Sequence, residues 1–87
     1  MNENKNIFQI SLAAARVNAR LRQKDAAIKL GVTEKTLGNY ESGKTVIPGP
    51  TLQRAAKLYN IPVDFIRLPV VDDGKHDDDF FLISSTV

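Results

Sequence analysis

The stretch from Gln23 to Gly43, QKDAAIKLGVTEKTLGNYESG, constrains the fold of this chain more than any other. Ala27 is small enough to let two helices approach closely, and Gly31 suits the left-handed backbone of a tight turn. Leu37 follows Gly31 and is placed to fill the space between the helices. The spacing therefore predicts two helices joined by a short turn, although any closely packed helix pair can carry the same three residues.

The two helices of this pair are expected over residues 23–30 and 34–42. Gly31 and Gly43 end them, because glycine adopts the left-handed conformation that closes many helices. Thr33 is a good N-cap for the second helix, since its hydroxyl can accept a hydrogen bond from the first turn. The chain therefore marks both ends of the second helix.

Helical signals continue on both sides of the pair. Ser11 is a good N-cap for a helix over 12–20, and Pro50 at a first helical position begins a fourth helix. The segment IPVDFIRLP, residues 61–69, allows a short fifth helix before Pro69. Apolar residues recur at helical spacing. The residues expected to face the core are Ile10, Ala13, Ala14, Val17, Leu21, Ala26, Ala27, Leu30, Val32, Leu37, Tyr40, Leu52, Ala55, Ala56 and Tyr59.

The composition argues against several classes of protein. The chain has 87 residues, the length of one domain, and no cysteine for a disulfide framework or a thiolate zinc site. With His76 as its single histidine, we expect no enzyme, no metal and no cofactor. No apolar run is long enough to span a membrane, and the polar start is not a signal peptide, so we expect a cytoplasmic protein.

Charge is divided unequally along the chain. Residues 1–67 hold eleven Lys or Arg against five Asp or Glu, a net charge of +6. Residues 68–87 hold one Lys against five Asp, a net charge of −4. The basic region suggests an anionic partner such as nucleic acid, and the alternative is ordinary solvated surface charge.

The helix pair and its flanks resemble the Cro/cI-type, or XRE-like, helix-turn-helix family of phage and bacterial transcriptional regulators. The resemblance rests on Gln23 at the start of the second helix, on Leu-Gly-Val-Thr at the turn (30–33), and on Glu-Ser-Gly after the third helix (41–43). It extends through ISLAAARVNARLRQKDAA and LQRAAKLYNIPVDFI, so it covers about residues 10–67.

The family implies an all-α, five-helix, lambda-repressor-like DNA-binding domain over residues 1–69, whose third helix reads the major groove of double-stranded DNA. Residues 70–87 form an acidic and apolar tail, read as a linker, a β-strand or a partner-binding segment. Cro-like proteins sometimes dimerise through C-terminal strands, so we expect a homodimer on a DNA operator in a bacterial host. The alternative function is an antirepressor or antitoxin-like module that binds a partner repressor of the same fold.

Carried onto this chain, the resemblance implies two sets of DNA-contacting residues. Asn39 can pair with adenine, and Lys35 can donate to guanine. Glu34 either accepts from cytosine or only stabilises the helix N-terminus, and Thr36 either contacts DNA or satisfies the helix backbone. Gly38 leaves a gap where relatives often touch DNA. The base-contacting set is Gln23, Glu34, Lys35, Thr36 and Asn39, and the backbone-contacting set is Arg20, Arg22, Thr33, Lys44 and Thr45.

Two residues of the backbone-contacting set depart from the family pattern. Arg20 stands where related sequences often have a glycine that ends the first helix. Arg22 replaces the usual Ser or Thr N-cap and so removes a side-chain acceptor. Both either place cations beside Gln23, where phosphates would lie, or are simply solvated. Glu41 is expected to be a structural carboxylate that bonds nearby backbone or Arg16.

Overall fold

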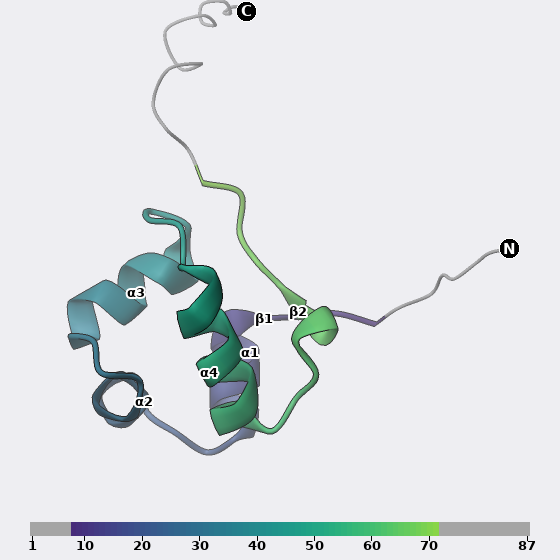
Figure 1. Cartoon of the computed structure of the whole chain (residues 1–87), viewed down its shortest axis with the longest axis horizontal. Coiled ribbons are helices and arrows are strands. Elements are labelled where there is room, and N and C mark those ends of the chain that lie inside the picture. Colours follow the sequence, from purple (N-terminus) through teal and green to yellow (C-terminus); the bar gives the residue numbers. More distant parts are fainter. Residues whose placement is uncertain (1–7, 72–87) are drawn as a thin grey trace, which may run out of the picture.

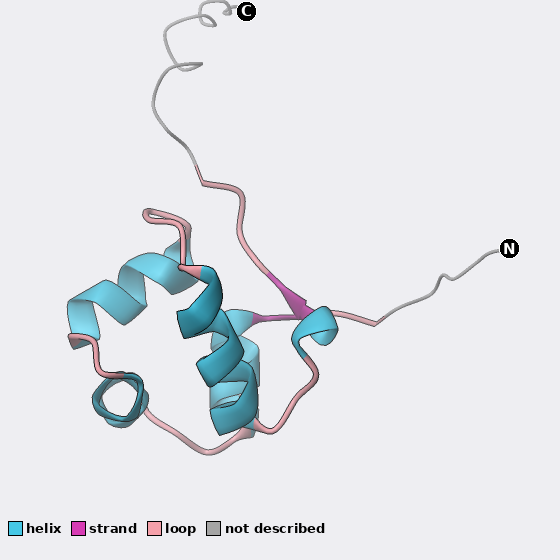
Figure 2. Ribbon diagram, viewed as in Figure 1, coloured by secondary structure: helices cyan, strands magenta, loops and turns pink. Residues whose placement is uncertain are grey.

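The computed structural model describes residues 8–71 of the chain. Within this region four α-helices pack around one apolar core, and a pair of short strands lies beside them (Figures 1 and 2). The elements in chain order are β1 (Ile10–Ser11), α1 (Leu12–Asn18), α2 (Gln23–Leu30), α3 (Glu34–Ser42), α4 (Gly49–Tyr59), the 3-10 helix η1 (Val63–Phe65) and β2 (Ile66–Arg67).

Two helices begin at the side-chain caps that the sequence predicts. Ser11 Oγ accepts a hydrogen bond from the Ala14 N–H at 3.0 Å, and Thr33 Oγ1 accepts one from the Thr36 N–H, also at 3.0 Å. Each bond satisfies a backbone donor that has no partner inside its helix. Helix α2 follows Arg22, which makes no capping hydrogen bond with its side chain.

Residues with left-handed backbone follow all four helices. Gly31, Gly43 and Asn60 end α2, α3 and α4 with φ of 75°, 84° and 58°. Arg20, two residues after the end of α1, has φ of 64°. A glycine, which the family resemblance predicts here, adopts this angle more readily than an arginine, because side chains disfavour left-handed backbone.

The all-α prediction is wrong for the segment predicted to form a fifth helix. This segment forms one 3-10 turn, η1, and then the strand β2, which pairs in parallel with β1 so that Ile66 lies opposite Ile10. Only a few residues separate Pro62 from Pro69, and Pro69 disfavours helical backbone at the residue before it. The extended form instead buries Ile66 and completes backbone hydrogen bonds with β1, so the described region is mostly helical with a small sheet.

Two other helix boundaries differ slightly from the prediction. Helix α1 ends at Asn18 rather than at residue 20, and α4 begins at Gly49, one residue before Pro50. The predicted tail covers residues 70–87, and residues 72–87 lie outside the described residues, so the alternatives for the tail stay predictions.

Helix α1 packs against the core with a different side from the one predicted. Its inward side runs through Leu12, Ala15 and Ala19 rather than through Ala13 and Val17. Val17 is 60% exposed. Both sets of residues have the spacing of a single helix face, so the spacing alone does not distinguish them.

The core is built from one face of each helix. Leu12 and Leu37 are its largest completely buried side chains. Tyr40 and Tyr59 are also buried, as their positions in the apolar pattern predict. The buried apolar residues are Leu12, Ala15, Ala26, Ala27, Leu30, Leu37, Tyr40, Ile47, Ala55, Ala56, Tyr59 and Ile66.

Candidate nucleic-acid interface

The helix pair α2–α3 is assembled by the three residues that the spacing singles out. Ala27 and Leu37 are buried where the helices meet, and Gly31 makes the turn between them. The Val32 N–H donates to the Ala27 carbonyl at 3.0 Å and closes the end of α2. In Figure 1 α2 is seen end-on while α3 runs across the view, so the turn directs α3 away from the axis of α2.

Helix α3 has one buried face and one polar face. Leu37 and Tyr40 point into the core, whereas Glu34 and Lys35 are exposed and Asn39 is partly exposed. The periodicity of the helix separates these groups, since residues one or two positions apart point in different directions. Polar side chains predicted to contact bases therefore share the side of α3 that does not pack against the domain.

The two threonines at the start of α3 bond to each other. The Thr33 hydroxyl donates to Thr36 Oγ1 at 2.8 Å, in addition to accepting from the Thr36 N–H. The Thr33 side chain thus caps the helix. The Thr36 hydroxyl hydrogen can still be donated, either to DNA or to the helix backbone. Both interpretations of Thr36 are therefore compatible with this geometry.

The predicted cations lie around the helix pair. Arg20 is exposed in the loop before α2. Arg22 Nε donates to Asp25 Oδ2 at 3.0 Å, and this hydrogen bond raises the pKa of Arg22 and lowers the pKa of Asp25. The pair is exposed, so it holds Arg22 only weakly. Arg22 therefore remains available to an anionic partner.

The loop after α3 folds back onto the helix end. The backbone N–H groups of Lys44 and Thr45 both donate to the Asn39 carbonyl, at 2.9 and 3.3 Å, and both side chains are exposed. A Cβ at Gly43 would lie 3.0 Å from Pro69 Cβ. Gly43 is therefore needed for its positive φ and for the close approach of the segment after β2.

A largely buried ion pair joins α1 to α3. Arg16 Nε donates to Glu41 Oε2 at 2.7 Å and Arg16 Nη2 donates to Glu41 Oε1 at 3.2 Å, while Arg16 Nη1 reaches the Leu21 carbonyl at 3.0 Å. The side chains of Arg16 and Glu41 are 14% and 7% exposed. The hydrogen bond to Glu41 raises the pKa of Arg16. The predicted structural role of Glu41 is confirmed.

Gln23 joins this ion pair from α2. Its Nε2 donates to Glu41 Oε1 at 3.0 Å, so the side chain lies along α3 and is partly buried. A Cβ at Gly38 would lie 3.5 Å from Gln23 Nε2. The sequence reasoning did not anticipate this contact. The signal was present in the spacing, because Gly38 and Glu41 are three residues apart and share a face of α3.

A family comparison identifies the fold of this helix pair. The sequence model of a helix-turn-helix family matches residues 12–66. The chain belongs to this helix-turn-helix family. The match confirms the resemblance to the Cro/cI-type, XRE-like regulators and places the protein among DNA-binding transcription regulators. No curated protein and no solved structure matches the chain significantly.

Two negative observations apply to the described part of the helix-turn-helix protein. No helix within residues 8–71 has the length and apolar character needed to cross a membrane. In the same region, no three His, Asp or Glu side chains gather into a group that could hold a metal ion.

Tyr59 is expected to lower the stability of the helix-turn-helix domain at alkaline pH. Burial, followed by the nearby Glu41 carboxylate, raises the pKa of Tyr59 from 10.0 to about 12. The folded state therefore holds the phenolic proton more tightly than the unfolded state, and this stabilisation is lost as pH rises from about 10 to about 12. We expect wild-type protein to lose stability over this interval relative to Tyr59→Phe, measured by urea unfolding. If the difference in free energy of unfolding between wild type and Tyr59→Phe stayed constant over this pH interval, the Tyr59 hydroxyl would not be shielded from water.

Proposed function

We propose that the protein is a sequence-specific regulator of the phage repressor or Cro-like kind, which reads the major groove of double-stranded DNA with α3. The observation that carries this proposal is the two-sided character of α3. Leu37 and Tyr40 hold the helix in the core, and Lys35 and Asn39 project from its other side. A helix presented in this way fits the width of the major groove of B-DNA.

The polar side chains of α3 and α2 offer complementary groups to base edges. Asn39 carries the donor and acceptor that match adenine, and the Lys35 ammonium donates to guanine O6 and N7. Thr36, Glu34 and Gln23 complete the proposed base-contacting set. The remaining contacts position the protein on phosphate. We assign them to Arg20, Arg22, Thr33, Lys44 and Thr45, all exposed around the helix pair.

Selection of bound sequences from random DNA duplexes, followed by footprinting, tests this function. We expect a consensus with two-fold symmetry, because a homodimer presents two copies of α3 to two half-sites. Affinity should fall with salt by about 0.9 in log–log slope for each phosphate neutralised. Weak, salt-sensitive binding without any consensus would contradict the proposal.

Asn39→Ala and Arg22→Ala should affect binding differently. Loss of a base contact costs about tenfold or more in discrimination against other sequences, so Asn39→Ala should relax sequence preference. Arg22→Ala should weaken binding to operator and random duplexes alike and reduce the salt slope by about 0.9. Fluorescence anisotropy at several salt concentrations measures both effects.

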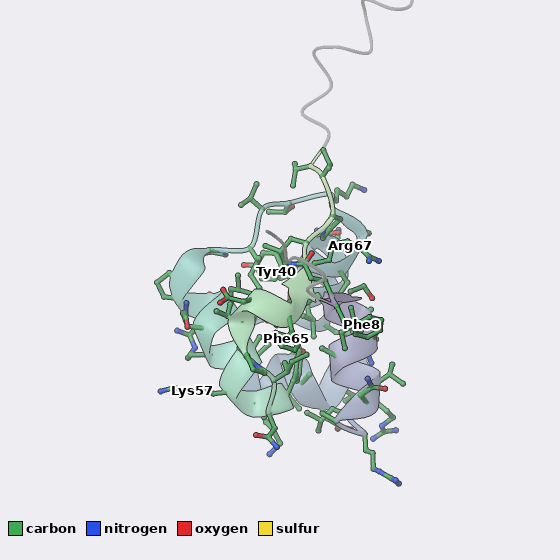
Figure 3. All side chains as sticks on the ribbon, turned by 90° about the vertical axis from the view of Figure 1, so that its right-hand side faces the viewer. Phe8, Tyr40, Lys57, Phe65 and Arg67 are labelled. Atoms are coloured by element: carbon green, nitrogen blue, oxygen red, sulfur yellow. The ribbon has the colours of Figure 1, made fainter. Side chains whose placement is uncertain are left out.

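The control for these variants is Lys57→Ala. Lys57 is an exposed cation near the end of α4 that projects from the edge of the domain in Figure 3 and belongs to neither proposed contact set, so its removal should change DNA affinity little. Identical behaviour of Asn39→Ala and Arg22→Ala on operator and random DNA would contradict the division of roles.

The second candidate function is an antirepressor or antitoxin-like module. It is favoured by two exposed aromatic side chains near the strands, Phe8 and Phe65, which are 74% and 42% exposed and lie on the face shown in Figure 3. An apolar patch on one face, rather than single exposed residues, is typical of a protein-binding surface. Stable binding to a partner repressor, with no retardation of any duplex in the selection, would favour this function over DNA reading.

A further inference from the structure

The carboxamide of Gln23 lies in van der Waals distance of the point where the Cβ of a side chain at residue 38 would stand. A Cβ at Gly38 would meet the Gln23 Nε2, Oε1 and Cδ atoms at 3.5, 3.7 and 3.8 Å. All three distances are ordinary van der Waals contacts, and all three atoms belong to one amide group. Gly38 is therefore not an empty place in α3. The point where its Cβ would stand is in contact with a polar group that comes from α2.

Glu41 determines which way this amide faces. A carboxylate only accepts hydrogen bonds, so Glu41 Oε1 must face the NH2 group of Gln23, 3.0 Å away. Glu41 is itself held by the two hydrogen bonds from Arg16. Gln23 Oε1 and the second N–H of Nε2 make no hydrogen bond to any residue within 8–71. One acceptor and one donor thus remain for a ligand.

We propose that Gln23 and Gly38 form a single reading position for adenine, with Glu41 and Arg16 as positioning residues. Gly38 places no side chain beside the amide. Gln23 supplies the amide, and its free acceptor and donor match adenine N6 and N7. This inference rests on the proposed function. It replaces the interpretation of Gly38 as a gap in specificity, because the amide required there is supplied by the neighbouring helix.

The test compares selected DNA sequences for wild-type protein, Gln23→Ala and Gln23→Met. Methionine keeps the length of the side chain but has no amide, so it controls for packing. We expect both variants to lose the adenine preference at one base pair of each half-site and to bind the operator on the order of tenfold more weakly. Preference at the other base pairs should persist. Lys24→Ala, an exposed change in the same turn of α2, should leave the selected sequence unchanged.

A rescue variant makes the test specific to the amide. Adding Gly38→Gln to Gln23→Ala returns a carboxamide to the same place from α3, and we expect adenine preference to return at that base pair or its immediate neighbour. Glu41→Gln replaces an acceptor-only group by an amide, so it should weaken preference at this base pair and leave the positions read by Lys35 and Asn39. A change confined to one base pair is not produced by general loss of structure.

Two outcomes would overturn the inference while leaving the proposed function intact. In the first, Gln23→Ala weakens operator and random duplexes by the same factor, which would make Gln23 a phosphate contact only. In the second, the variant selects the wild-type consensus with wild-type affinity. Failure of wild-type protein to select any consensus would instead overturn the proposed function itself, and the inference with it.

Discussion

Glu41→Ala is expected to lower the free energy of unfolding by about 3–5 kcal/mol, the range for breaking a buried ion pair from one side. The substitution leaves the Arg16 side chain, only 14% exposed, without its carboxylate partner and removes the acceptor of Gln23. A small domain has a total stability of about 5–15 kcal/mol, so this loss is a large part of it. Urea unfolding followed by circular dichroism measures the effect.

Two controls separate burial from charge in this prediction. Asp25→Ala breaks the exposed Arg22–Asp25 pair and should leave the urea midpoint close to that of wild type. The double variant Arg16→Met with Glu41→Leu removes both charges and should recover much of the stability lost by Glu41→Ala. A wild-type midpoint for Glu41→Ala would show that Arg16 finds another partner or solvent, contrary to the geometry.

Leu37→Ala is expected to lower the free energy of unfolding by about 3 kcal/mol. Leu37 is completely buried in the core, where it extends from α3, and the packed residues around it limit how far the cavity can close. Because the same side chain sets the spacing of the helix pair, DNA affinity should fall even where the variant remains folded. Urea unfolding and operator titration measure the two effects separately.

Ile28→Ala is the matched control for Leu37→Ala. Both substitutions shorten an aliphatic side chain of the helix pair, but Ile28 is 69% exposed. Its truncation should change the urea midpoint and DNA affinity little, since little apolar surface returns to water. Equal losses in the two variants would contradict the assignment of Leu37 as the residue that fills the helix junction.

The local parts of the fold could be predicted well from the sequence. Ser11 and Thr33 cap helices, and Gly31 and Gly43 end them, because these interactions involve residues only a few positions apart. The parallel pairing of β1 with β2 could not be predicted in this way. It joins Ile10 to Ile66 across most of the domain, and the intervening helices must be placed before the two strands can meet.

In the candidate interface, too, the local features could be predicted and the contacts between helices mostly could not. The polar face of α3 follows from helical periodicity, and so the exposed position of Lys35 could be predicted from its neighbours. The link between Arg16 and Glu41 was also anticipated. The position of the Gln23 amide over Gly38 was not, because it depends on where the start of α2 meets the middle of α3.

The sequence by itself determined the four segments that become α-helices, where most of them begin and end, and which family the helix pair resembles. It did not determine that the segment predicted as a fifth helix becomes a 3-10 turn and a strand. Only the tertiary structure decided that α1 turns Leu12 rather than Val17 inward, and that Gln23 covers Gly38. The physical reason is the range of the interactions. Caps and helical turns join residues within a few positions, whereas packing and side-chain bonds between helices depend on the relative placement of whole elements.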